Sequence, residues 1–319
     1  ERMPSGDDLD GAVINRGTMT VAEGGLAALV APYVQNSGVI NAKLGQVVLA
    51  SGKKATIDLS GDGLFELAAD EKLTKAIIRN TSSGKILAEG GNVLVTTATA
   101  VAALDNVINM RGIVDVSSVS VQGGKIVLSG GDATRVRVGG TLKSDGGTGG
   151  DVDVKGRSVR IQGDGKIMTG GGDITLHAQR RVRVTNGFAD AEGGNIRVET
   201  GNGFEGIGSS LVTSGTGTIY IQQVNPDLNT IQNAIDAISN SGTGTNTIDV
   251  AEGTWVENLY IGTDNLVLNG AKIGIFGDDP SRDGTGETVV EAADNALDTI
   301  TVIASNVVID GLTVTGGND

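Results

Sequence analysis

The chain has 319 residues and an acidic balance, with 24 Lys and Arg against 38 Asp and Glu and a net charge of −14. This balance argues against nucleic acid or anionic lipid as the main partner. Glycine supplies 51 residues and aromatics only 3%, yet 39% of the chain is hydrophobic, so neither a core of bulky rings nor disorder is expected. No apolar run approaches the ~18 residues that a membrane-spanning helix needs. Cysteine is absent, which excludes disulfides and thiolate metal sites.

The N-terminal third carries a loose repeat. Apolar segments that begin at Val13 and Val34 lie 21 residues apart, and each ends in Asn-x-Gly and is followed by a second apolar strand. Related copies at Asn80 and Asn109 have different spacings, and a weak helical turn is expected near 69–78. Asparagine at these turns either tolerates left-handed backbone geometry or stacks its amide on the next repeat. The first is the simpler interpretation.

A regular repeat occupies the middle of the chain. Its anchors are the second glycine of each Gly-Gly pair, Gly150, Gly172 and Gly194, then Gly217, at spacings of 22, 22 and 23 residues. Alternating apolar residues follow every anchor, which is typical of strands with one buried face. A rung of this length buries its apolar row only by stacking on its neighbours, as in a parallel β-helix. The register predicts one inward column of Val152, Ile174, Ile196 and Ile219.

Three segments carry a specific resemblance: the run from Gly24 to Gly52, Asp58-Leu-Ser-Gly-Asp-Gly-Leu64, and Val107-Ile-Asn-Met-Arg-Gly112. Their order and spacing resemble the filamentous haemagglutinin family of two-partner secretion exoproteins, over about residues 10–222. The resemblance implies a right-handed parallel β-helix that is exported through a partner outer-membrane barrel and acts as an adhesin or fibre shaft. The family's Asn-Pro-Asn type secretion element is not present, so no residue is assigned to transporter contact.

The sequence pattern changes after Val224. Ile231, Ala234, Ile235 and Ile238 share one face of a predicted helix near 228–240, which Asn229 or Thr230 can cap. The strands that follow resemble the opening of pectin-lyase-like β-helices, in which a short helix covers the first rung. We therefore expect an all-β fold in two parts, a haemagglutinin-like shaft at 1–223 and a pectin-lyase-like segment at 224–319. The pattern predicts more chain at both ends.

Carbohydrate-active β-helices need clustered carboxylates on one exposed face. Asp249, Glu252, Glu257 and Asp264 are candidates by residue type alone, without a recognisable catalytic arrangement. The sequence therefore assigns no catalytic, cofactor-binding or metal-ligating residue, and it predicts no cofactor. His177, the single histidine, is expected to point outward as a structural residue. The polar excursion at 277–287 is more simply a solvated loop than a Ca²⁺ site.

Basic residues gather on neighbouring rungs of this acidic chain: Arg135, Arg137, Arg157, Arg160, Arg180, Arg181 and Arg183. Isolated outward charges on solvated strands are the simpler interpretation. The alternative is a basic stripe that meets an acidic polysaccharide or a neighbouring fibre.

The predicted function is a structural or adhesive segment of a large secreted bacterial surface fibre, exported by two-partner secretion to a Gram-negative-type cell surface. It would serve extension, adhesion, or fibre or matrix assembly. Expected partners are the transporter barrel, host or matrix carbohydrate or protein, and other copies of the chain, but not nucleic acid. Two alternatives stay open, an exported polysaccharide-active enzyme and the stalk of a contact-dependent toxin delivery protein.

Overall fold

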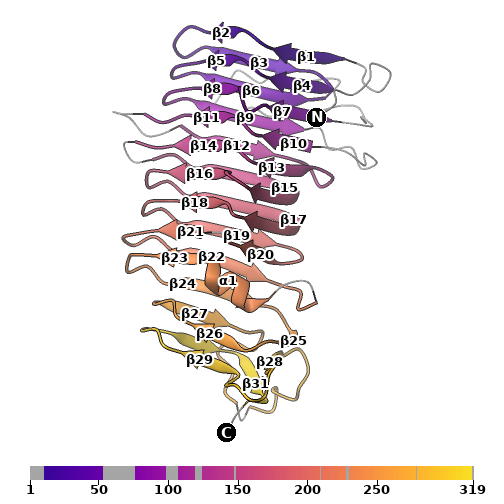
Figure 1. Cartoon of the computed structure of the whole chain (residues 1–319), viewed down its shortest axis with the longest axis vertical. Coiled ribbons are helices and arrows are strands. Elements are labelled where there is room, and N and C mark those ends of the chain that lie inside the picture. Colours follow the sequence, from indigo (N-terminus) through magenta and orange to yellow (C-terminus); the bar gives the residue numbers. More distant parts are fainter. Residues whose placement is uncertain are drawn as a thin grey trace.

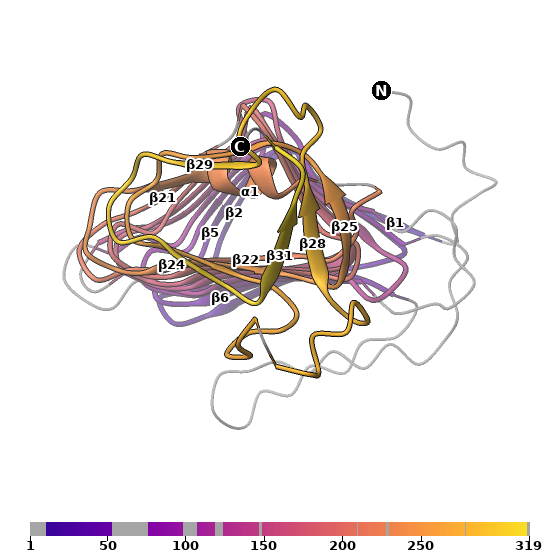
Figure 2. The same cartoon turned by 90° about the horizontal axis from the view of Figure 1, so that it is seen from below.

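A computed structural model describes residues 11–52, 76–97, 107–118, 124–146, 149–208, 210–227, 230–277 and 279–317. Short strands stack along the long axis (Figure 1), and the rungs superimpose around one common interior when viewed along it (Figure 2). Every pairing between strands of the described residues is parallel, and the paired strands are separated by one rung. The all-β parallel β-helix expected from the repeat is therefore confirmed. The segment Asp58–Leu64 and most of the turn expected near 69–78 lie outside the described residues, while Ile77 and Ile78 belong to a strand.

Each rung contributes to three faces. The first face consists of β3 (Leu26–Val30), β6 (Gln46–Ser51), β9 (Asn92–Thr97), β12 (Ile126–Ser129), the first halves of β15 (Val152–Gln162) and β17 (Ile174–Thr185), β19 (Ile196–Thr200), β22 (Ile219–Gln223), β24 (Asn246–Val250), β27 (Leu266–Asn269) and β30 (Val308–Asp310). Its ladder is unbroken from β3 to β30.

The second face consists of β1 (Ala12–Asn15), β4 (Tyr33–Asn36), β7 (Ile77–Asn80), β10 (Val107–Met110), β13 (Arg135–Val138), the second halves of β15 and β17, and β20 (Phe204–Ile207). The third face consists of β2 (Thr18–Thr20), β5 (Val39–Asn41), β8 (Lys85–Leu87), β11 (Ile113–Asp115), β14 (Thr141–Ser144), β16 (Lys166–Thr169), β18 (Phe188–Asp190), β21 (Ser210–Thr213) and β23 (Ile238–Asn240). Two small sheets complete the C-terminal rungs, β25 (Gly253–Val256) with β28 (Thr288–Glu291) and β31 (Leu312–Thr315), and β26 (Leu259–Ile261) with β29 (Ile300–Val302).

The interior is built from the predicted apolar column. Val152 pairs with Ile174, Ile174 with Ile196, and Ile196 with Ile219, and all four side chains are fully buried. The anchor glycines let these rungs approach, because a Cβ on Gly194 would overlap the carbonyl oxygen of Gly172 in the rung before it. The sequence repeat thus marks the positions where backbone stacks directly on backbone.

Asparagines in the N-terminal rungs form a buried ladder. The Asn15 Nδ2 donates to Asn36 Oδ1 at 2.9 Å, and the Asn36 Nδ2 donates to Asn80 Oδ1 at 3.0 Å. All three lie in strands and outside the set of residues with positive φ, so the simpler interpretation, a left-handed turn residue, is wrong for them. Asn109 does not continue the ladder, because Met110 pairs with Asn80 instead.

A single helix, α1 (Ile231–Ala237), is found in the described part of the chain, inside the predicted range 228–240. It follows β22 and packs beside β20, so it occupies the place of a second-face strand for one rung (Figure 1). Thr230 caps it by accepting a hydrogen bond from the Asn233 N–H, while Asn229 lies outside the described residues. Because β22 pairs directly with β24, the first face passes α1 without interruption. No helix of the described residues has the length and hydropathy to cross a membrane.

Candidate functional site

Three arginines stack on the outside of the second face. Arg137 of β13 pairs with Arg160 of β15, and Arg160 pairs with Arg183 of β17. Parallel strands lie about 4.8 Å apart, so three guanidinium groups project from consecutive rungs at one position. Glu205 of β20 takes that position in the following rung. We call Arg137, Arg160, Arg183 and Glu205 the arginine column.

A neighbouring column creates a hollow beside these residues. Arg135 pairs with Ser158, which pairs with Arg181. The small side chain of Ser158 leaves space between two long ones, and a hollow of about 220 Å³ opens there. Its lining includes the five arginines of the two columns, Arg135, Arg137, Arg160, Arg181 and Arg183. Isolated outward charges, the simpler interpretation of these arginines, are therefore wrong for these five.

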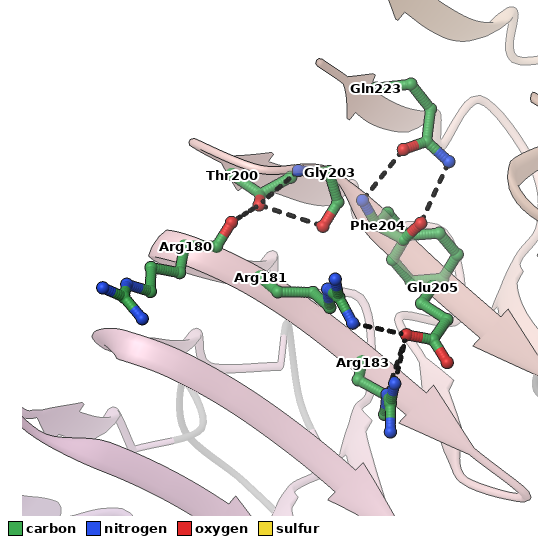
Figure 3. Close-up of polar contacts among 8 residues, drawn as sticks. All are labelled: Arg180, Arg181, Arg183, Thr200, Gly203, Phe204, Glu205 and Gln223. Atoms are coloured by element: carbon green, nitrogen blue, oxygen red, sulfur yellow. Dashed lines mark hydrogen bonds and ion pairs between the residues drawn. The ribbon is translucent and has the colours of Figure 1, made fainter. Parts of the chain in front are cut away.

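The positive charge of the arginines that line the hollow is only partly neutralised. The Glu205 carboxylate accepts hydrogen bonds from Arg181 at 3.1 Å and from the Arg183 Nε at 2.9 Å (Figure 3). Within the described residues, the side chains of Arg135, Arg137 and Arg160 form no hydrogen bond or ion pair. Burial lowers the pKa of Arg160 below its usual value, and the charges of Arg183 and Arg137 lower it further. The positive charge is therefore concentrated where it is least compensated.

The fold itself does not require arginine at this position. In earlier rungs the same column contains Gln35, Arg79 and Asn109, all aligned by the strand register. A second hollow of about 250 Å³ lies there, lined by Gln35, Arg79, Asn80, Thr81, Ser82, Asn109 and Arg111. The outer surface of the second face thus carries a polar and basic track along the molecule.

Two of the predicted basic residues lie outside the hollow. Arg157 and Arg180 are at the bends of β15 and β17, where each strand passes from the first face to the second. In Figure 3 the Arg180 side chain points away from Arg181 and Arg183, and its carbonyl oxygen accepts a hydrogen bond from Thr200 at 2.6 Å. For these two arginines, an isolated outward charge is the appropriate description.

The carboxylates considered for catalysis do not gather. Asp249 accepts hydrogen bonds from the Tyr220 hydroxyl at 2.8 Å and from Asn269 Nδ2 at 2.9 Å. Asp264 accepts the backbone N–H of Ser305 at 2.7 Å, and Glu252 is exposed on a turn. Asp249 thus bonds side chains of the neighbouring strands β22 and β27, whereas Asp264 bonds the backbone of a turn, so these carboxylates do not share a site.

Glu257 serves the helix. Its two carboxylate oxygens accept the backbone N–H groups of Ile231 and Gln232 at 2.8 and 3.0 Å, which satisfies the open first turn of α1. Burial raises the pKa of Glu257 above its usual value, while these two hydrogen bonds act in the opposite direction. The residue therefore links the rung of β25 to the helix that precedes it.

The remaining predicted residues also have local partners. His177 is partly exposed and its Nδ1 lies 3.1 Å from Glu199, a carboxylate whose pKa is lowered first by Arg197 and then by His177. In the polar excursion, Asp279 and Asp283 accept hydrogen bonds from Ser281 and Thr285 of their own turns. Asp278 of this segment lies outside the described residues.

Two residues of this region had no signal in the sequence. Glu205 lies between Phe204 and Gly206, and no Gly-Gly pair precedes its strand to mark the register in the sequence. Its alignment with Arg183 in the arginine column is therefore visible only in the structure. Gln223 is completely buried, and its side-chain amide both accepts from the Phe204 N–H at 2.9 Å and donates to the Phe204 carbonyl at 3.1 Å (Figure 3). The Gln223 side chain thereby supplies two hydrogen bonds that a neighbouring strand would otherwise give to β20 on the side of α1.

Comparisons with protein-family models, with curated proteins and with solved structures give no match for this chain. The class that the fold defines is the parallel β-helix, and the outward arginine column is its most distinctive surface feature.

Proposed function

We propose that this chain is a structural and adhesive segment of a large secreted bacterial surface fibre. The observation that carries this proposal is the first face, whose ladder passes without interruption from β3 to β30 over a buried apolar interior. Such an architecture resists bending, because each rung is bonded to both neighbours. It presents long outward columns of polar side chains that suit many weak contacts.

The route to the surface belongs to the same proposal. The resemblance of residues 10–222 to filamentous haemagglutinins supports export by two-partner secretion to a Gram-negative-type cell surface. The transporter barrel is then the partner during export, and matrix or host glycans, proteins or other copies are partners afterwards. The scattered, locally bonded positions of Asp249, Glu257 and Asp264 favour this role over glycan cleavage.

Solution scattering and an activity screen test the proposal together. The purified chain should scatter as a rod and should bind surfaces coated with extracellular matrix, while leaving acidic and neutral glycans uncleaved. Glycan turnover that is lost in Asp249→Asn or Glu257→Gln would replace this proposal with an enzyme. A compact scattering profile would contradict the shaft directly.

A further inference from the structure

The arginine hollow combines features that a folded shaft alone does not need. Like charges at directly paired positions destabilise a sheet, yet Arg137, Arg160 and Arg183 occupy three consecutive rungs. Gln35 and Asn109 show that an uncharged amide is compatible with this column. The repeated arginines therefore have a cost for folding, and an external anion would offset it.

The molecule itself contains an example of the anion that fits. The Glu205 carboxylate sits at the end of the column, where a single oxygen accepts from Arg181 and from both Nε and Nη2 of Arg183. Guanidinium groups match carboxylates in geometry as well as charge. Arg135, Arg137 and Arg160 project into the same hollow and have no such partner among the residues that the structure describes.

The shape indicates a chain rather than a small molecule. Each of the two hollows, about 220 and 250 Å³, is smaller than the roughly 300 Å³ at which enclosed small-molecule pockets begin. They lie in line, because the column that passes through Arg79 continues through Arg137 to Arg183. A flexible polymer with repeated carboxylates can follow this line and place successive groups on successive rungs.

We propose that the arginine column and its hollow bind a linear polyuronate, an acidic polysaccharide whose carboxylates pair with Arg135, Arg137 and Arg160. This inference rests on the adhesive part of the proposed function and names its ligand class. Glu205 limits the site at one end, since it already occupies Arg181 and Arg183.

Fluorescence anisotropy with labelled polygalacturonate tests the site in the whole chain. We expect saturable binding that weakens with added salt and is absent for the methyl-esterified polymer, which lacks the charge. Arg137→Gln and Arg160→Gln should each weaken binding about tenfold, the loss expected for a charged hydrogen-bonded pair. Arg180→Gln, the matched control at the adjacent bend of β17 and outside the hollow, should leave binding unchanged.

Two further variants separate a built site from general attraction. Ser158→Leu fills the hollow without changing the net charge and should weaken binding severalfold, while Glu205→Gln releases Arg181 and Arg183 and should tighten it by a similar factor. Thermal unfolding of each variant, monitored by circular dichroism, establishes that the β-helix is intact. A drop in affinity for Arg180→Gln equal to that for Arg160→Gln would overturn the site, because attraction would then be diffuse.

The remaining outcomes concern the ligand class. Binding of heparin with no binding of polygalacturonate would overturn the carboxylate assignment in favour of sulfate. Concentration-dependent self-association that is lost in Arg160→Gln, without polymer binding, would identify a second copy of this acidic chain as the occupant and overturn the proposal. A rod that binds no polyuronate refutes this inference alone, whereas cleavage of polygalacturonate refutes the proposed function.

Discussion

The first and second faces of the β-helix differ in how their backbone hydrogen-bonding groups are satisfied. On the first face every strand from β3 to β27 pairs with a strand of the next rung, the last pair being β27 with β30, so the ladder satisfies the backbone groups along this face. On the second face the ladder stops at β20, and α1 takes the next place. There, the side chain of Gln223 bonds the exposed edge and the side chain of Glu257 bonds the helix.

The rungs stay in register where the second face is interrupted, because the first face continues from β22 to β24 and the third face continues from β21 to β23. The second face can then accept a helix, and it can also carry the paired arginines that would weaken a ladder with no support from elsewhere. The first face thus keeps the rungs continuous, while the second face carries the helix and the arginines. Four predictions test this division, beginning with the largest effect.

The first prediction concerns the interior of the first face. Ile174→Asp removes a fully buried side chain and places a carboxyl group between Val152 and Ile196. Loss of apolar burial and the cost of an unpaired polar group together should lower the free energy of unfolding by roughly 5 kcal/mol. Chemical denaturation measures this value.

Thr175→Asp is the matched control for that variant. Thr175 is the next residue of β17, faces outward, and pairs with Arg197 in the following rung. We expect a change below about 1 kcal/mol. Equal losses for the two variants would contradict the division into inward and outward columns.

The second prediction concerns the interrupted ladder. Gln223→Ala leaves the buried N–H and carbonyl of Phe204 without the amide that bonds them, which should cost roughly 3 kcal/mol. Hydrogen exchange should accelerate in β20 and α1 while β19 and β22 stay protected. Gln179→Ala, an exposed glutamine at the bend of β17, should change neither. Uniform loss of protection over both faces would show that they are not separable.

The repeat and its inward register were predictable, because glycine anchors and alternating apolar residues are local signals. The column from Val152 to Ile219 follows directly from the positions of Gly150, Gly172, Gly194 and Gly217. The helix was also predictable, since its apolar spacing and its cap at Thr230 lie within a few residues.

Side-chain pairings between rungs were not predictable in the same way. Asn15 and Asn36 bond across 21 residues, and Glu257 bonds Ile231 across 26. Whether an outward arginine meets another arginine depends on the register of both strands and on the bends between Gly156 and Ser158. The sequence showed that basic residues gather on neighbouring rungs. The strand register was needed to show which of them line the hollow and which lie at the bends.

The third prediction uses Glu257, which joins α1 to the next rung. Its pKa in the folded chain is raised above 4.5 because burial disfavours the charged form. The folded state therefore holds the proton more tightly, and stability from this group falls as pH rises from about 4.5 through the raised pKa. Glu257→Gln should lack this decline, so the stability of wild type relative to the variant should decrease with pH in that interval. Exposed Glu252→Gln is the control. A wild-type advantage that grows with pH would contradict the raised pKa.

The last prediction, which has the smallest expected effect, concerns the outside of the first face, where polar side chains project in columns from the uninterrupted ladder. The Tyr220 hydroxyl donates to Asp249, and Arg197 lies 4.5 Å from the centre of its ring. Burial, reinforced by the hydrogen bond and charge of Asp249, raises the pKa of Tyr220 to about 12. Asp249→Asn removes the charge and should move this pKa back toward 10, as measured by the ultraviolet absorbance of tyrosinate, with Tyr220→Phe identifying the transition. Because the folded pKa is raised, the contribution to stability is complete below about 10 and disappears as pH rises through 12. If the pKa stays the same in Asp249→Asn, the outward columns do not couple neighbouring rungs, and the first face depends on its backbone ladder and buried interior alone.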